Sequence, residues 1–381
     1  MRKRILYVVN ADWYFRLHWL DRAKAAKSAG FDVSVATPIT DSAIRCQIER
    51  EGIKVIPWGV SRSGRNLIKE LRSVFQLRKI FKSEQSDIIH SITVKPNFYT
   101  ICLASLMRLN FILSVTGLGM LFTSTKILDR FTAGLVKFSY VSTSRKHPIL
   151  FENNDDLRII SSSPLSKTEN LKKVMGAGVS SKDYEFSLLK PLAGSLVLLF
   201  AARLLKPKGL DVLVDAVQEL NAQGLDVELR VAGINDPDSP LAIPNEQIEL
   251  WSKFPFFKFL GNRKDIPKLI KEAHCVCLPS TYGEGIPRIL IEAAAMGRPL
   301  ITTDVPGCKE ICEDQVNGFL VPPGESLPIV EAVKRFLEAP TKLDQMGRNS
   351  KKIFDRGYDN EQVMAFTLDT YRIALYSPRV S

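Results

Sequence analysis

The sequence predicts an α/β protein made of two Rossmann-like domains, each a doubly wound parallel sheet, that face each other across a cleft. Short apolar runs alternate with longer amphipathic segments over short links, which is the pattern of strands and helices in parallel sheets. The alternation stops between residues 162 and 193, a stretch with several serines, glycines and prolines, and then starts again. A chain of 381 residues is also long for a single hydrophobic core.

The first half of the chain contains short apolar runs that we interpret as buried strands. These runs are residues 5–9, 32–36, 54–57, 87–90, 111–115, 148–151 and 158–161. Amphipathic segments between most of them predict helices at 13–28, 42–51, 66–82, 97–108 and 128–139. Gly30 follows the first of these segments and is a typical C-terminal stop for a helix.

The second half repeats the pattern. Its predicted strands are residues 196–202, 227–232, 256–260, 274–278, 299–302 and 318–321. Its predicted helices are 209–222, 245–253, 266–273, 287–296, 308–312, 328–337, 342–355 and 360–375. We therefore place the domains at 1–175 and 196–358, with an interdomain linker at 176–195 and a C-terminal helical segment at 359–381.

Composition narrows the class of protein. The net charge of +11 favours an anionic partner, which is a nucleotide, a nucleic acid or an anionic lipid surface, unless the surface is simply basic and solvated. Six cysteines without a CxxC pair predict reduced thiols in the cytosol. Four histidines without metal-ligand spacing predict no metal site. We expect no membrane-spanning segment, because no apolar run reaches about 18 residues.

The most informative stretch runs from Tyr282 to Glu292, after a predicted strand and into a predicted helix. Gly283 and Gly285 allow a ligand to approach the backbone closely. Glu284 follows the carboxyl end of the strand, where open parallel sheets bind ligands. Pro287 suits the first turn of the helix. Glu284 is a candidate to contact a sugar, and the alternative is that it is an ordinary turn residue. Glu292 is a candidate to hold a ribose, and the alternative is that it is a surface glutamate of the helix.

Two cations mark the corresponding position after the first strand of the second half. Arg203 ends that strand, and Lys208 directly precedes a helix. Fixed cations beside a helix N-terminus form a diphosphate site. The alternative is an ordinary basic turn, which is less attractive because Glu284 and Glu292 are predicted to share the same edge of the sheet.

These motifs, with Gly261-Asn-Arg263, Asp304-Val-Pro-Gly307 and 317–321, resemble the retaining glycosyltransferases of family 4, which have the GT-B fold. The resemblance covers nearly the whole chain and is strongest over residues 196–325. It implies that the second domain binds a nucleotide sugar, that the first binds the acceptor, and that 359–381 cross back to the first domain. The implied donor-binding residues are Arg203, Lys208, Arg263, Gly285, Ile286, Pro287 and Glu292, with Glu284 contacting the transferred sugar.

The first half resembles a subgroup of that family acting on sugars linked to polyprenyl diphosphate in bacterial glycan assembly. The similar segments are 10–18, 90–96, 116–119 and 151–156. The resemblance implies acceptor contacts at His18, Lys95, Gly117 and Gly119. His90, at the end of a predicted strand, either faces the donor sugar as a catalytic residue or packs in the core.

The expected reaction transfers a hexose or N-acetylhexosamine from a UDP-sugar to a lipid-linked saccharide, with retained configuration, no cofactor and no metal. The predicted helix at 66–82 carries Lys69, Arg72, Arg78, Lys79 and Lys82 and suits an anionic membrane, unless it is an ordinary helix with a solvated basic face. We thus expect a cytoplasmic enzyme on the inner face of the cytoplasmic membrane that binds no nucleic acid. Alternatives are a UDP-N-acetylhexosamine epimerase and a non-catalytic nucleotide- or membrane-binding protein.

Overall fold

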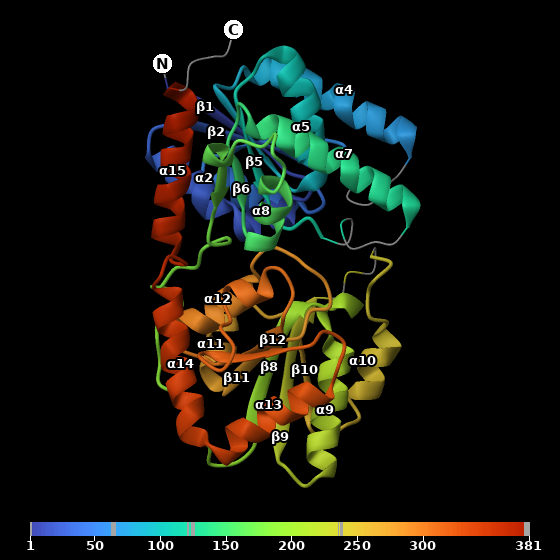
Figure 1. The fold of residues 1–381 in the computed structure, drawn as a ribbon, viewed down its shortest axis with the longest axis vertical. Coiled ribbons are helices and arrows are strands. Elements are labelled where there is room, and N and C mark those ends of the chain that lie inside the picture. The colour runs from blue at the N-terminus through green and yellow to red at the C-terminus, as the bar shows by residue number, and fades with distance from the viewer. Residues whose placement is uncertain are drawn as a thin grey trace. The chain divides into compact units, whose positions relative to one another are not determined.

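The structure is a computed structural model that describes residues 2–61, 66–119, 122, 126–234, 236 and 239–376. Its internal contacts divide the chain into two units. Unit 1 contains Met1–Gly178 and Asn360–Ser381, and unit 2 contains Val179–Asp359. Residues 179–195, which we predicted as part of the linker, therefore group with unit 2, and the C-terminal segment from Asn360 onward groups with unit 1 (Figure 1).

Unit 1 contains a seven-stranded parallel sheet in the order β3-β2-β1-β4-β5-β6-β7. The strands are β1 (Arg4–Val8), β2 (Asp32–Thr37), β3 (Lys54–Pro57), β4 (Ile88–Ile92), β5 (Phe111–Val115), β6 (Ile149–Phe151) and β7 (Leu171–Lys173). The order reverses between β1 and β4, which is the arrangement of a doubly wound sheet.

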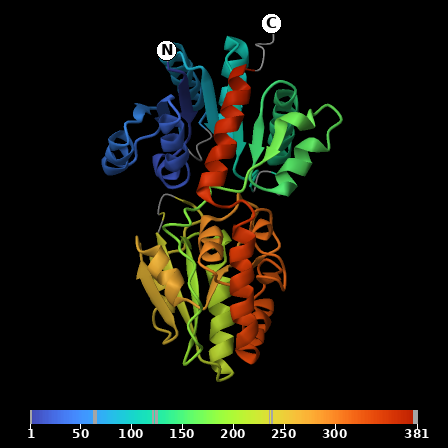
Figure 2. The ribbon, with the colours of Figure 1, turned by 90° about the vertical axis from the view of Figure 1, so that its left-hand side faces the viewer.

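The helices of unit 1 cover both faces of this sheet. They are α1 (Asp12–His18), α2 (Leu20–Ser28), α3 (Ser42–Arg50), α4 (Leu67–Glu84), α5 (Val94–Met107), α7 (Ile127–Ser144), α8 (Asn154–Ser161) and α15 (Asn360–Tyr376). Side-chain caps fix several of their starts: Asp41 accepts from Ala43 N, and Asn153 accepts from Asp156 N. Figure 2 shows α15 running beside the N-terminal helices of unit 1, where it contacts α2.

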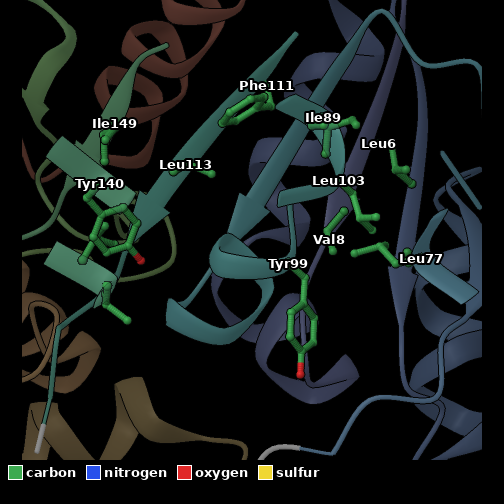
Figure 3. Close-up of a cluster of buried hydrophobic side chains, with 14 of the residues drawn as sticks. Leu6, Val8, Leu77, Ile89, Tyr99, Leu103, Phe111, Leu113, Tyr140 and Ile149 are labelled. Atoms are coloured by element: carbon green, nitrogen blue, oxygen red, sulfur yellow. The ribbon is translucent and has the colours of Figure 1, made fainter. Parts of the chain in front are cut away.

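Alternate residues of β1 point into two separate cores. Leu6 and Val8 belong to one cluster, while Ile5 and Tyr7 belong to the other. The first cluster lies beneath α4, α5 and α7 (Figure 3), and the second lies beneath α1, α2 and α15. Because both faces are covered, the strands read as continuous apolar runs, which is why the sequence predicted them.

Unit 2 contains a six-stranded parallel sheet in the order β10-β9-β8-β11-β12-β13. Its strands are β8 (Leu196–Arg203), β9 (Val227–Ile234), β10 (Phe257–Gly261), β11 (Cys275–Leu278), β12 (Leu300–Thr303) and β13 (Gly318–Val321). Its helices are α9 (Leu210–Ala222), α10 (Asn245–Trp251), α11 (Ile266–Glu272), α12 (Arg288–Ala295), α13 (Leu327–Glu338) and α14 (Pro340–Phe354). The predicted pair of doubly wound parallel sheets is confirmed.

Several local predictions were wrong. The predicted strand at 158–161 lies inside α8, because Asn153 caps a short amphipathic helix there. The predicted helix at 13–28 is divided at Trp19, which is buried and has non-helical backbone angles. The short strand β7 lies in the stretch 162–193, where no strand was predicted. None of the helices in the described part of the chain is long and apolar enough to cross a membrane.

Candidate active site

The candidate site lies at the carboxyl edge of the sheet in unit 2. Arg203 is the last residue of β8, and the loop that contains Glu284 follows the neighbouring strand β11. Both groups therefore lie at the edge where parallel sheets bind ligands. The sequence predicted that each group follows the carboxyl end of a strand, and the resemblance to family 4 implied that they share one donor site.

Lys208 and Glu284 form a tight ion pair at this edge. Lys208 Nζ lies 2.6 Å from both carboxylate oxygens of Glu284, and Ser280 Oγ donates to Glu284 Oε1 at 3.0 Å. Burial lowers the pKa of the Lys208 ammonium, but the Glu284 carboxylate outweighs this effect, and the net pKa is raised. Lys208 thus stays cationic although it is only 7% exposed.

Two glycines allow neighbouring loops to close against the Glu284 loop. Gly307 has φ +90°, and a Cβ there would overlap the carbonyl oxygens of Glu284 and Gly285. Gly209 has φ +74°, and a Cβ there would overlap the carbonyl oxygen of Pro279. Three segments that carry the predicted site are thereby held within contact of one another.

Arg203 has a different partner from Lys208. Its guanidinium Nη1 lies 3.1 Å from Asp236 Oδ2, after strand β9. The side chain of Arg203 is 29% exposed, so part of it faces solvent at the edge of the sheet. Asp236 was not among the predicted residues, since nothing local distinguishes it from an ordinary loop aspartate.

Glu292 lies in α12 and is buried, with 6% of its surface exposed. Its Oε1 accepts from Tyr184 Oη at 2.7 Å and from Arg288 Nε at 2.8 Å. Burial raises the pKa of the Tyr184 hydroxyl, and the Glu292 carboxylate raises it further, so the hydroxyl remains a donor. Sequence reasoning missed both partners of Glu292. The spacing of four residues between Arg288 and Glu292 was a usable signal for Arg288, whereas Tyr184 had no local signal.

The remaining predicted donor residues occupy the ends of neighbouring elements. Arg263 follows β10, is solvent-exposed and pairs with Asp265 at 2.6 Å. Gly285, Ile286 and Pro287 form the link into α12, with Pro287 one residue before the helix.

His90 was predicted to end a strand. It lies instead in the middle of β4 and is fully buried. Its Nδ1 lies 2.7 Å from Tyr371 Oη, and its Nε2 lies 2.9 Å from Ser114 Oγ. Burial first, and the charge of Arg22 second, lower the pKa of His90 to about 3. The imidazole is therefore neutral at physiological pH, and its contacts are those of a core residue that holds α15 against the sheet.

This burial has a testable consequence for acid stability. An unfolded histidine titrates near 6.5, whereas folded His90 has a pKa of about 3. The stability contributed by neutral His90 is present above pH 6.5 and is lost as pH falls toward 3, by about 1.4 kcal/mol per pH unit. The expected result is that His90→Gln shows a shallower loss of unfolding free energy between pH 6 and 4 than the parent, measured by urea denaturation. Equal slopes would contradict the assignment.

The predicted acceptor residues lie after the strands of unit 1. His18 ends α1, and its ring lies 4.5 Å from the ring of Tyr14. Lys95 is the second residue of α5 and pairs with Glu70 at 2.7 Å. Gly117 and Gly119 follow β5 with φ +114° and +60°.

Within the described ranges no cluster of three or more His, Cys, Asp or Glu side chains is placed to hold a metal ion. Metal independence itself stays a prediction.

Leu118 N, between the two loop glycines Gly117 and Gly119, donates to Asp156 Oδ2 at 2.9 Å and fixes this loop against α8.

Two family models match the chain. Residues 4–151 match "Glycosyl transferase 4-like", and residues 180–353 match "Glycosyl transferases group 1". Alpha-D-kanosaminyltransferase of Streptomyces kanamyceticus is 30% identical over 159 residues, which is 40% of this chain and 39% of that protein. The chain thus aligns with less than half the length of that relative.

Two further proteins are similar over most of the chain. An N,N'-diacetylbacillosaminyl-diphospho-undecaprenol alpha-1,3-N-acetylgalactosaminyltransferase of Campylobacter jejuni is 26% identical over 303 residues, which is 75% of this chain and 77% of that protein. The crystal structure of Anabaena Alr3699/HepE in complex with UDP-glucose has a TM-score of 0.74 at 20% identity and covers 96% of this chain and 99% of that one. The latter likeness shows a shared fold.

Proposed function

We propose a function from the premise that this chain belongs to the group 1 glycosyltransferases and has the GT-B fold. The proposed reaction transfers a hexose or N-acetylhexosamine from a UDP-sugar to a lipid-linked saccharide in bacterial glycan assembly. The observation that carries this proposal is the buried ion pair of Lys208 and Glu284, beside Arg203, at the carboxyl edge of the unit 2 sheet. A cation kept charged in a mostly buried position is suited to a diphosphate.

The donor is proposed to be a UDP-sugar. The similar HepE structure contains UDP-glucose, which supports a nucleotide sugar. Arg203 and Lys208 would neutralise the diphosphate, Glu292 would hold the ribose hydroxyls, and the backbone of Gly285 to Pro287 would lie against the sugar and phosphates. Arg263 would contribute to the same donor.

The acceptor is proposed to be a saccharide on polyprenyl diphosphate. The Campylobacter relative is named for an acceptor of this kind and for an N-acetylhexosamine donor group. His18, Lys95 and the loop of Gly117 and Gly119 would contact it, and Lys95 would attract its phosphates. A lipid-anchored acceptor would place the enzyme on the inner face of the cytoplasmic membrane.

The proposed chemistry retains the configuration at the anomeric carbon. The acceptor hydroxyl would attack from the face that the diphosphate leaves, the anomeric C–O bond would break, and the departing phosphate would take the hydroxyl proton. Lys208 and Arg203 would stabilise the negative charge that develops on the leaving group. Glu284 would interact with the sugar as positive charge develops on it, and no step requires a metal. His90, which is buried in the core of unit 1, takes no step in this proposed reaction.

The proposal is tested by incubating the chain with a panel of UDP-sugars and polyprenyl-diphosphate saccharides, with and without EDTA. We expect a glycosylated lipid product whose new linkage has the donor's configuration by NMR, formed equally with EDTA. A new UDP-sugar formed from the donor alone would instead identify an epimerase, and binding without any product would identify a non-catalytic protein.

Tyr184 offers a sharper test of the ribose contact. Tyr184→Phe removes one donor to the Glu292 carboxylate, and hydrogen bonds to charged groups are worth about 1.5–3 kcal/mol. We expect the Kd for UDP to rise by about tenfold, and 2′-deoxy-UDP to be discriminated less strongly than by the parent. Tyr358→Phe is the control, because Tyr358 is a buried tyrosine of unit 2 that donates elsewhere, to the Glu310 carbonyl. Equal UDP affinities for the two variants would exclude this role.

A further inference from the structure

Three neighbouring helices of unit 1 present apolar side chains to solvent. Helices α4, α5 and α7 lie next to one another on one face of the sheet, with α5 in contact with both of the others (Figure 1). Their inner faces pack into the core, to which Leu77 of α4, Leu103 of α5 and Tyr140 of α7 belong (Figure 3). Their outer faces therefore have no partner within this core.

Helix α7 has the longest exposed apolar row. Ile127, Leu128, Phe131, Leu135 and Phe138 are 86%, 65%, 65%, 46% and 66% exposed. At about 100° per residue these positions share one face over three turns, opposite to the buried face. Such a row on a soluble helix normally faces a core, so its exposure calls for a partner.

Helix α4 adds a second row of mixed character. Leu67, Ile68, Leu71 and Phe75 are 72%, 64%, 50% and 62% exposed. The same face continues toward the C-terminus with exposed basic residues, namely Arg78, Lys79 and Lys82. The ordinary explanation, a helix with its apolar side buried and a basic side solvated, does not account for the first two turns. Between these helices, α5 exposes Phe98 and Leu106.

The charges of this surface decide which partner fits. On α4, α5 and α7 the exposed charged side chains are all basic, and they include Lys69, Arg72 and Arg130. The acidic residues are partly buried, and Glu70 pairs with Lys95 at 2.7 Å. A second copy of this chain would bring like charges together, and nucleic acid would leave the apolar rows uncovered. An anionic lipid surface matches both the charge and the apolar area.

We infer that the outer faces of α4, α5 and α7 form a membrane-docking surface, in which the apolar rows of α7 and α4 enter the lipid headgroup region and the basic turns of α4 bind anionic lipids. The surface acts by insertion as well as by charge. This inference rests on the proposed function only in that a lipid-linked acceptor requires a membrane. It can be tested separately, because vesicle binding is measured without donor or acceptor.

The test is sedimentation of the full chain with vesicles of phosphatidylcholine alone or with about 30% phosphatidylglycerol. Leu128→Ser/Leu135→Ser is expected to lower the partition coefficient on anionic vesicles at least about tenfold. The matched control is Leu327→Ser/Leu250→Ser in unit 2, where the two leucines are 65% and 53% exposed. We expect the control to stay within about twofold of the parent.

A second pair of variants separates charge from insertion. Arg78→Gln/Lys79→Gln/Lys82→Gln is expected to lose the preference for anionic vesicles, whereas Lys253→Gln/Lys342→Gln/Lys352→Gln, exposed in unit 2, is expected to keep it. Circular dichroism verifies that each variant is folded. Equal binding by the α7 variant and its control would overturn the proposal, as would a dimer of the parent that Leu128→Ser/Leu135→Ser dissociates. Transfer activity without vesicle binding would overturn this inference and leave the proposed reaction standing.

Discussion

Replacing Arg203 and Lys208 together by alanine is expected to lower kcat/KM for the UDP-sugar by at least about 10³-fold. Removal of a single group that stabilises transition-state charge costs about 10²–10³-fold in rate, and two cations would act on the same leaving diphosphate. The Lys208→Ala change also leaves Glu284 without its 2.6 Å cation, which disturbs the proposed sugar contact. The measurement is steady-state kinetics with donor and lipid-linked acceptor.

Lys206→Ala is the matched control for this pair. Lys206 lies in the same turn as Lys208 but is exposed, whereas Lys208 is buried. We expect the control to keep activity within about twofold, since a solvated lysine contributes little. A double variant that turns over UDP-sugar at the parent rate, with an unchanged melting temperature, would refute the diphosphate site.

Arg298→Leu is expected to give the largest loss of stability, about 3–5 kcal/mol. Arg298 is fully buried, and burial lowers its pKa to about 10, so it is still cationic at neutral pH. Its guanidinium donates to the carbonyls of Ile270, Ser187 and Met296 at 2.9, 2.7 and 3.0 Å. Leucine fills part of the space but removes all three of these charged hydrogen bonds, and the Ile270 and Met296 carbonyls then keep the longer bonds from Ala273 N at 3.2 Å and Ser187 N at 3.4 Å.

Arg348→Leu provides the comparison for calorimetric measurement. Arg348 is half-exposed in α14 and pairs with Asp344 at 2.8 Å within the same helix. Surface ion pairs of this kind are worth less than about 1 kcal/mol. If the two leucine variants lose similar amounts of stability, the buried network around Arg298 is not what holds this part of unit 2.

The Arg298 network also bears on the proposed donor site. Ser187, which the guanidinium contacts at both its carbonyl and its hydroxyl, lies three residues after Tyr184. Tyr184 in turn donates to Glu292. A stability defect at Arg298 is thus expected to weaken UDP binding as well, because the segment that carries Tyr184 loses its attachment to the sheet.

Much of the fold was predictable because the relevant signals are local. Strands β1, β8 and β11 are apolar except for the terminal Arg4 of β1 and Arg203 of β8, and the helices between the strands have a period of 3.6 residues. Glycines and prolines mark most of the links between them. Short elements such as β7 and α8 were missed or misassigned, since three to eight residues carry too little periodicity to distinguish strand from helix.

The sequence by itself determined two parallel sheets and the place of Arg203, Lys208 and Glu284 at one edge of the second. These follow from the order of strands, because the carboxyl ends of parallel strands meet at the same edge. Only the tertiary structure decided the partners of each side chain. Tyr184 and Glu292 are 108 residues apart in the sequence and His90 and Tyr371 are 281 apart, yet each pair forms a hydrogen bond. No local sequence pattern encodes such contacts. Packing between distant segments thus placed His90 in the core, supplied Glu292 with Tyr184, and left the apolar faces of α4 and α7 in solvent.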